Sequence, residues 1–219
     1  MKSLGWKTIV TAAAVAASVA GIAVAAAPAQ ASTANAQAGT VSAQSRAALT
    51  PAQLAALPLT DRNLTKQEID NLAVVLNAYH DAQGATLNVN GFINDFTKTG
   101  VFNDEVAGKT YTYQGKTLGD EVVYMADVFP NVHRDLYTIN VSPNVVTIEL
   151  SIEGTFEHPT QTPAGILKPN GANIEVPTGD FWYLKDGKIQ KFDCYVGYTD
   201  MYATMGVDLD WQAAVAKNG

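Results

Sequence analysis

The hydrophobic pattern of this chain changes at Pro130, and that change constrains the fold more than any other feature. Before Pro130, apolar residues recur at the three- and four-residue spacing of a helix, as at Ile69, Leu72 and Leu76. After it they occupy every second position, as in the run 146–152. Helices followed by long antiparallel strands predict an α+β domain in which a curved sheet wraps around helices.

Local signals set the ends of the expected elements. Thr65 and Glu68 form a capping-box pair at the start of the first long helix, and Gly84 ends that helix or lies just beyond it. Thr117 and Asp120 can cap a later helix, which ends at Pro130. The other expected elements are a short helix over 91–97, a short strand over 101–104, and strands over 132–141, 145–156, 173–184 and 188–198.

Two different turns can join the last two strands, and they give different registers. A three-residue loop over 185–187 is the favoured choice. It would pair Asp180 with Phe192 and keep both on the same side of the hairpin as Cys194. A two-residue Asp-Gly turn would move the register by one position and pair Asp180 with Asp193.

The composition excludes several classes of protein. Apolar residues make up 47% of the 219 positions, which is enough for a packed core. The 14 basic and 21 acidic side chains give a net charge of -7, and the absence of a basic block argues against a nucleic-acid partner or an anionic membrane surface. The single cysteine rules out a disulfide within the chain and a zinc site of the CxxC type.

The first 31 residues have the pattern of a secretory signal. Lys2 and Lys7 precede an apolar run over 8–27, and Ala29-Gln30-Ala31 offers small residues at a cleavage site. We expect cleavage after Ala31, which leaves a net charge of -9, export to a periplasmic or extracellular location, and no stable membrane insertion afterwards. The alternative is an uncleaved membrane anchor.

The rest of the chain divides into three expected segments. Residues 32–60 are rich in Ala, Ser, Thr and Gln and predict a flexible linker, in which Thr50-Pro51 can start a short helix through Leu57. Residues 61–207 form the expected domain. Residues 208–219 are expected to form a C-terminal tail.

Several local strings, taken in their order and spacing, resemble the NTF2-like superfamily and specifically its SnoaL-like, polyketide cyclase-like branch. The resemblance covers roughly residues 64–207. It implies a cone-shaped fold, in which a strongly curved mixed or antiparallel sheet is closed by N-terminal helices around an apolar pocket. The strings are Phe129-Pro130, Ile152-Glu153-Gly154-Thr155-Phe156, Pro169-Asn170-Gly171, Val176-Pro177, Asp180-Phe181-Trp182, Lys185-Asp186-Gly187-Lys188-Ile189 and Phe192-Asp193-Cys194-Tyr195.

The resemblance also implies roles for particular residues. By comparison with ketosteroid isomerase, Asp104 falls at the position of the base and Asp180 at that of a protonated acid. His80, at the edge of the first helix, would be an auxiliary proton-transfer group. Cys194 stands where the SnoaL-like cyclases carry their acid/base aspartate, so this chain departs from the cyclase pattern. The alternative is that Asp104 and Asp180 are ordinary loop and strand residues and that Cys194 is buried and inert.

The expected function is therefore that of an exported pocket protein which binds a small, largely apolar molecule. Its enzymatic form would be proton transfer next to a carbonyl, as in aldol cyclisation or isomerisation, and its alternative is a non-catalytic ligand-binding or partner-binding module. We expect no metal, no cofactor and a homodimer, with 157–173 as a candidate lid. The expected ligand-binding residues are Tyr79, Phe96, Phe102, Trp182, Phe192 and Cys194.

Overall fold

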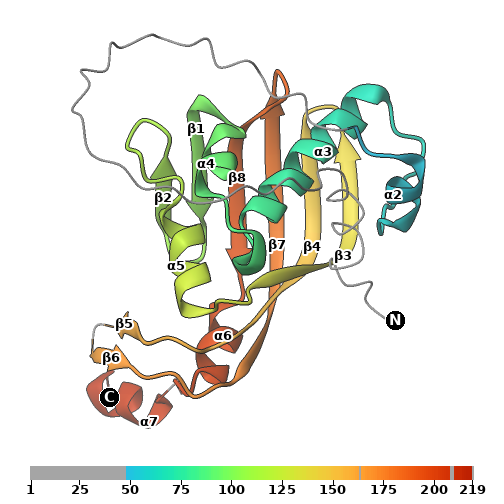
Figure 1. Ribbon diagram of the computed structural model, residues 1–219. Helices are drawn as coiled ribbons and strands as arrows, with labels where there is room; N and C mark the ends of the chain where they lie inside the picture. Colours follow the sequence, from blue (N-terminus) through green and yellow to red (C-terminus); the bar gives the residue numbers. More distant parts are fainter. Residues whose placement is uncertain (1–47, 163, 208–209, 219) are drawn as a thin grey trace, which may run out of the picture.

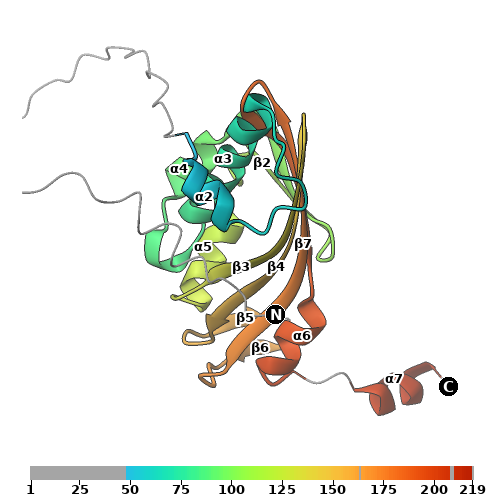
Figure 2. The same ribbon diagram turned by 90° about the vertical axis from the view of Figure 1, so that its right-hand side faces the viewer.

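A six-stranded sheet with helices along one face forms the body of the protein (Figures 1 and 2). The computed structural model describes residues 48–162, 164–207 and 210–218, so the expected signal segment lies outside the described residues. The helices are α2 (Pro51–Ala56), α3 (Lys66–Asp81), α4 (Val89–Asn94), α5 (Asp120–Val128), α6 (Tyr198–Thr204), α7 (Trp211–Asn218) and the short 3-10 helix η1 (Gly84–Thr86). The strands are β1 (Phe96–Asp104), β2 (Lys109–Thr112), β3 (His133–Ser142), β4 (Val145–Thr155), β5 (Thr160–Thr162), β6 (Gly165–Leu167), β7 (Asn173–Lys185) and β8 (Lys188–Val196).

The sheet has the strand order β2-β1-β8-β7-β4-β3, and it curves around α3, α4 and α5 (Figure 2). Neighbouring strands are antiparallel except β1 and β8, which are parallel. The expected α+β class and the curved mixed sheet are confirmed, and the sheet is open rather than closed into a barrel. We call the face that carries α3, α4 and α5 the inner face, and the opposite face the outer face.

Helix α3 begins where the sequence predicts and packs across the inner face. The Thr65 side chain accepts the Glu68 backbone N–H, and the Glu68 carboxylate accepts the Thr65 backbone N–H, so the capping box is complete. Leu72 and Val75 on α3 are fully buried, as is Tyr79. Burying each such side chain stabilises the fold by roughly 1.5–3 kcal/mol, so packing contributes more to this helix than its cap.

Residues 51–60, assigned from sequence to the linker, pack against the domain. Thr50 caps α2 with the expected proline in the first turn, and Leu57 at the end of the helix is only 1% exposed. The Thr60 backbone N–H then donates to the Ile139 carbonyl oxygen of β3 at 3.0 Å. A flexible linker would not bury Leu57, so residues 51–60 are an ordered part of the domain.

Two helix predictions differ from the structure in their details. The helix expected over 91–97 is α4, which ends at Asn94, and Phe96 opens β1 instead. Helix α5 begins after Gly119 without a side-chain cap, so the predicted capping by Thr117 is wrong. The Thr117 hydroxyl oxygen instead accepts the Thr112 backbone N–H at 2.9 Å, which fixes the loop after β2.

The β7–β8 hairpin combines a two-residue turn with a bulge. Asp186 and Gly187 both have positive φ, at 51° and 69°, which is the backbone of a type I′ turn. The favoured three-residue loop is therefore wrong. An extra residue on β8, Gln190, then moves the register again, so that Asp180 pairs with Cys194 and not with Phe192 or Asp193. The expected grouping of Asp180 and Cys194 on one side of the hairpin is correct.

The segment 157–173, a candidate lid, contains a small hairpin of β5 and β6 below the main sheet (Figure 1). Its Ile166 side chain is 68% exposed. In the described part of the chain, no helix has the length and apolar character needed to cross a bilayer.

Candidate functional site

A small cavity lies between the inner face of the sheet and the helices. Its volume is about 40 Å³, and because one water molecule needs roughly 10–15 Å³ by this kind of measure, it has room for about three. A larger ligand therefore requires wall residues to move. The walls come from α3, α4, α5, α6 and five strands: Tyr79, Ala82, Phe92, Phe102, Asp104, Glu121, Val122, Met125, Arg134, Ile152, Asp180, Trp182, Phe192, Cys194, Val196 and Tyr198.

Three polar side chains form a row across the cavity wall. Cys194 on β8 pairs in register with Asp104 on β1 and with Asp180 on β7. Adjacent strands lie about 4.8 Å apart, so the two aspartates stand roughly 10 Å apart with the thiol between them. The expected pair of buried carboxyl groups is thus brought to one cavity, since Asp104 is 1% exposed and Asp180 is 2% exposed.

One carboxyl oxygen of Asp180 accepts a hydrogen bond, and the other accepts none from the described residues. The Tyr79 hydroxyl donates to its Oδ2 at 2.6 Å, and the Trp182 indole N–H donates to the Tyr79 hydroxyl oxygen at 3.0 Å. Oδ1 is buried and accepts no hydrogen bond from the described residues. Burial raises the pKa of Asp180 to about 6, although Tyr79, Cys194 and Arg134 each favour the charged form.

Arg134 brings a positive charge to the cavity, and the sequence analysis did not select it. It lies on β3, and its Nη1 donates to the Ala82 carbonyl oxygen at 3.0 Å. The centre of the guanidinium lies 5.6 Å from the centre of the Tyr79 ring. Burial lowers the pKa of Arg134, and the charge of Asp180 opposes that change. Arginine stays protonated under all ordinary conditions, so the cavity holds a cation beside its acids.

Asp104 differs from Asp180 because both of its oxygens have donors. Oδ1 accepts the Ala107 backbone N–H at 3.1 Å, and Oδ2 accepts a short hydrogen bond from the Tyr198 hydroxyl. Burial, followed by this hydrogen bond, raises the pKa of Tyr198. The Asp104 carboxylate therefore lies at the cavity wall with its lone pairs already in use.

Glu121 is a third carboxyl group at the cavity. It lies in the first turn of α5 and accepts a hydrogen bond from the Tyr111 hydroxyl at 2.5 Å. Burial raises its pKa, which the hydrogen bond from Tyr111 partly offsets. An acidic residue at a helix N-terminus has an ordinary explanation in the helix dipole, so the sequence offers little reason to select it.

The Cys194 thiol is protonated at neutral pH. Burial raises the pKa of Cys194 well above its ordinary value, and the nearby charge of Asp180 raises it further. A thiol must lose its proton to act as a nucleophile, so this environment opposes covalent chemistry at Cys194.

The structure gathers most of the residues selected from sequence but not all of them. Of the residues selected from sequence, those that line the cavity are Tyr79, Phe102, Asp104, Asp180, Trp182, Phe192 and Cys194. His80 and Phe96 are not among the residues that line the cavity. Phe96 is buried beside Phe92, with ring centres 5.2 Å apart, and the His80 carbonyl oxygen accepts the Thr86 hydroxyl at 2.5 Å.

Comparisons with known proteins support the fold through structure alone. No family model and no curated protein sequence matches this chain. A protein from Jannaschia sp. classed as a SnoaL-like polyketide cyclase is similar with a TM-score of 0.56 and 13% identity, over 68% of this chain and 100% of that one. A protein from Bacillus cereus classed as a polyketide cyclase is similar with a TM-score of 0.55 and 19% identity, over 69% of this chain and 91% of that one.

A third similar structure has a ketosteroid isomerase-like fold and comes from Catenulispora acidiphila. Its TM-score is 0.50 at 20% identity, over 63% of this chain and 95% of that one, and it was crystallised with trimethylamine. Together these structures show that the chain has the NTF2-like fold, in the form found in SnoaL-like polyketide cyclases and ketosteroid isomerase-like proteins. At such low identity the likeness extends to the fold and not to the chemistry.

Proposed function

We propose that this protein binds a small, largely apolar carbonyl compound in the cavity and transfers a proton at the carbon next to the carbonyl group. The observation that carries the proposal is the open Oδ1 of Asp180, a buried carboxylate oxygen in an aromatic cavity. A pKa of about 6 suits a general base near neutral pH, because enough of the group is charged while its proton affinity remains high.

Asp180 takes the role of base in this proposal, in place of Asp104. Asp104 already accepts two hydrogen bonds, whereas Asp180 keeps one oxygen for a substrate proton. As Asp180 Oδ1 takes the proton, the C–H electrons move into the carbonyl group and form an enolate. The Arg134 guanidinium has donors beyond its bond to Ala82 and would stabilise the enolate oxygen.

The fate of the enolate then decides the reaction. Return of the proton from Asp180 to a different carbon gives an isomer. Attack of the enolate carbon on a second carbonyl group closes an aldol ring, and the new alkoxide oxygen then takes the proton back from Asp180. The cavity of about 40 Å³ favours the smaller substrates that isomerisation accepts, unless the walls move. Trp182 and Phe192, whose rings stack with centres 3.5 Å apart, would form one wall for a flat ligand.

The test is exchange of α-protons for deuterium, in heavy water, with ketones from acetone through cyclohexanone to 2-tetralone. We expect the protein to accelerate exchange and Asp180→Asn to abolish the acceleration. Asp186→Asn is the matched control, since Asp186 lies in the exposed hairpin turn and asparagine tolerates its positive φ. Binding of these ketones without any exchange would instead establish the non-catalytic alternative.

We also propose that the mature chain is exported and forms a homodimer. The signal-like segment 1–31 supports export. Phe181 and Tyr195, which contact each other on the outer face and are 39% and 47% exposed, support a partner surface there. Native mass spectrometry of protein from the cell envelope tests both. A mass that includes residues 1–31 would contradict cleavage, and a monomer would contradict pairing.

A further inference from the structure

The outer face of the sheet carries a second cluster of polar residues, separate from the cavity. His133 and Asp135 lie two positions apart on β3, and Glu153 pairs with His133 from β4. One nitrogen or oxygen atom from each of the three lies within 4.8 Å of the others. Their neighbours Arg134 and Ile152 line the cavity on the inner face, because successive residues of a strand point to opposite sides.

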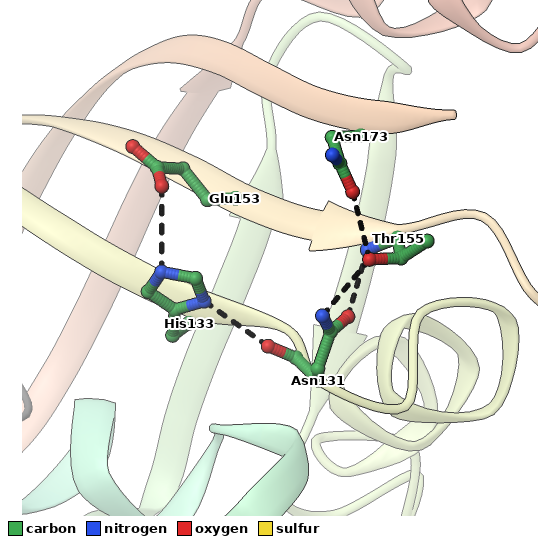
Figure 3. A network of polar contacts seen from close by, with 5 residues as sticks. All are labelled: Asn131, His133, Glu153, Thr155 and Asn173. Atoms are coloured by element: carbon green, nitrogen blue, oxygen red, sulfur yellow. Dashed lines mark hydrogen bonds and ion pairs between the residues drawn. The ribbon is translucent and has the colours of Figure 1, made fainter. Parts of the chain in front are cut away.

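The hydrogen bond of His133 fixes which ring nitrogen is available. Nδ1 lies 3.0 Å from the backbone carbonyl oxygen of Asn131, and because a carbonyl oxygen only accepts, Nδ1 must carry the hydrogen. Nε2 is then the nitrogen that faces Glu153 Oε2, 3.3 Å away, and in the neutral form of the ring it presents its lone pair there (Figure 3). Two lone pairs at this distance repel unless a proton or a metal ion lies between them.

The residue that orients the imidazole is itself held in place. The Asn131 side-chain amide donates to the Thr155 hydroxyl at 2.9 Å, and its Oδ1 accepts the Thr155 backbone N–H at 2.7 Å. The Thr155 hydroxyl donates in turn to Asn173 Oδ1 at 2.9 Å, so three segments are linked (Figure 3). Metal-binding histidines in proteins almost always donate their other N–H to a fixed acceptor of this kind.

The acidic residues around His133 favour a divalent cation between His133 and Glu153 over a single proton there. Glu153 lies between His133 and Glu175 in the register of the sheet, and Asp135 faces the same side as His133. One protonated imidazole offsets the charge of one carboxylate only. A divalent ion would offset two, and it would remove the repulsion between the lone pairs of His133 and Glu153.

We propose that His133, Asp135 and Glu153 bind a divalent transition-metal ion of the Zn²⁺ type, with His133 Nε2 and one oxygen of each carboxylate as ligands. Two ligand atoms about 2.0–2.1 Å from a tetrahedral ion stand about 3.3 Å apart, which is the distance from Nε2 to Oε2. Three protein ligands leave a position for water. The His133 and Glu153 side chains are 21% and 27% exposed, so the ion has a path from solvent.

Calorimetric titration of the purified, untagged chain with ZnCl₂, after removal of metals by a chelator, tests this site. We expect one Zn²⁺ per chain, and more than tenfold weaker binding in His133→Gln and in Glu153→Gln. Mg²⁺ at the same concentration should bind far more weakly, since it prefers oxygen ligands. Glu149 is an exposed glutamate four residues from Glu153 along β4, on the same face. The control variants Glu149→Gln and His158→Gln should each bind Zn²⁺ within twofold of the unmodified chain.

A spectroscopic measurement on the unmodified chain keeps the proposal testable if a variant fails to fold. In ¹⁵N NMR of the histidine rings, Zn²⁺ should shift the Nε2 signal of His133 while Nδ1 keeps its hydrogen. A Zn²⁺ response at His158 instead of His133 would overturn the proposal. So would equal affinities of the Glu153→Gln and Glu149→Gln variants, or no Zn²⁺ binding by the unmodified chain.

Discussion

The two faces of the same sheet hold acidic residues in opposite circumstances. On the inner face, Asp180 is 2% exposed, and burial raises its pKa to about 6. On the outer face, the Glu153 side chain is 27% exposed and lies beside a histidine. The two faces of the sheet thus place one acidic side chain in a buried cavity and another at the edge of solvent.

The comparison explains why we assign the two faces different chemistry. A carboxylate in a dry cavity binds a proton more readily, because water no longer stabilises its charge. That property suits proton transfer. On the outer face, the carboxyl groups of Asp135 and Glu153 gather beside an imidazole, and that combination of ligands suits a metal cation. A single layer of β-sheet separates the cavity on the inner face from the cluster on the outer face.

The largest effect should come from Asp180→Asn in the exchange assay. Loss of a general base costs about 10²–10⁴-fold in rate, and we expect a loss in that range. Asp104→Asn should cost less than tenfold, since both Asp104 oxygens are already hydrogen-bonded. For the unmodified chain, the rate should rise with pH through about 6 and then level off. A larger loss in Asp104→Asn would reverse the two roles.

The same residue should reduce stability at neutral pH. The pKa of Asp180 rises from its ordinary value of 3.8 to about 6 on folding, so its contribution is fully present below pH 3.8 and is lost as pH rises through about 6. At about 1.36 kcal/mol per pKa unit, the loss is at most roughly 3 kcal/mol. Asp180→Asn should therefore melt higher than the unmodified chain at pH 7.5 and no higher at pH 4. Equal melting temperatures at both pH values would contradict the raised pKa.

Trp182→Phe should lower stability by about 2 kcal/mol, because it replaces the buried indole with a smaller ring and removes a hydrogen bond. The indole is 1% exposed, stacks on Phe192 and donates to the Tyr79 hydroxyl. Chemical denaturation with urea measures this loss. Tyr195→Phe, at an exposed ring on the outer face, is the matched control and should change stability by less than about 0.5 kcal/mol.

The smallest effect should come from Glu153→Gln in metal-free protein. A partly exposed His–Glu pair contributes about 0–1 kcal/mol, so unfolding by urea should change by no more than that. In the presence of Zn²⁺ the unmodified chain should gain stability and the variant should gain much less. A loss of several kcal/mol without metal would show that the outer-face cluster is structural.

The sequence predicted the fold well because its signals are local or periodic. The capping box at Thr65 and Glu68 and the alternation along β4 need no knowledge of distant residues. The hairpin register was wrong because the turn has two residues in place of three and because β8 carries an extra residue at Gln190. Gln190 is not a glycine, so the sequence here carries no signal of the glycine type of bulge.

The candidate site was predicted in part for the same reason. Asp104, Cys194 and Asp180 were selected by resemblance, and they form a row across three strands. Arg134 was missed because an arginine in a strand is usually exposed. It lies two positions before Leu136 on β3, so both side chains point to the inner face. Glu153 becomes the partner of His133 only when β3 and β4 pair, so the sequence analysis did not select either residue.

By itself the sequence determined the class of fold, the order of its elements and the aromatic character of the cavity. These depend on hydrophobic spacing, which each segment carries within itself. Tertiary structure decided which aspartate keeps an open oxygen, where Arg134 places its charge and which acids surround His133. Those properties depend on distances between strands far apart in the chain, and such distances exist only once the sheet has formed.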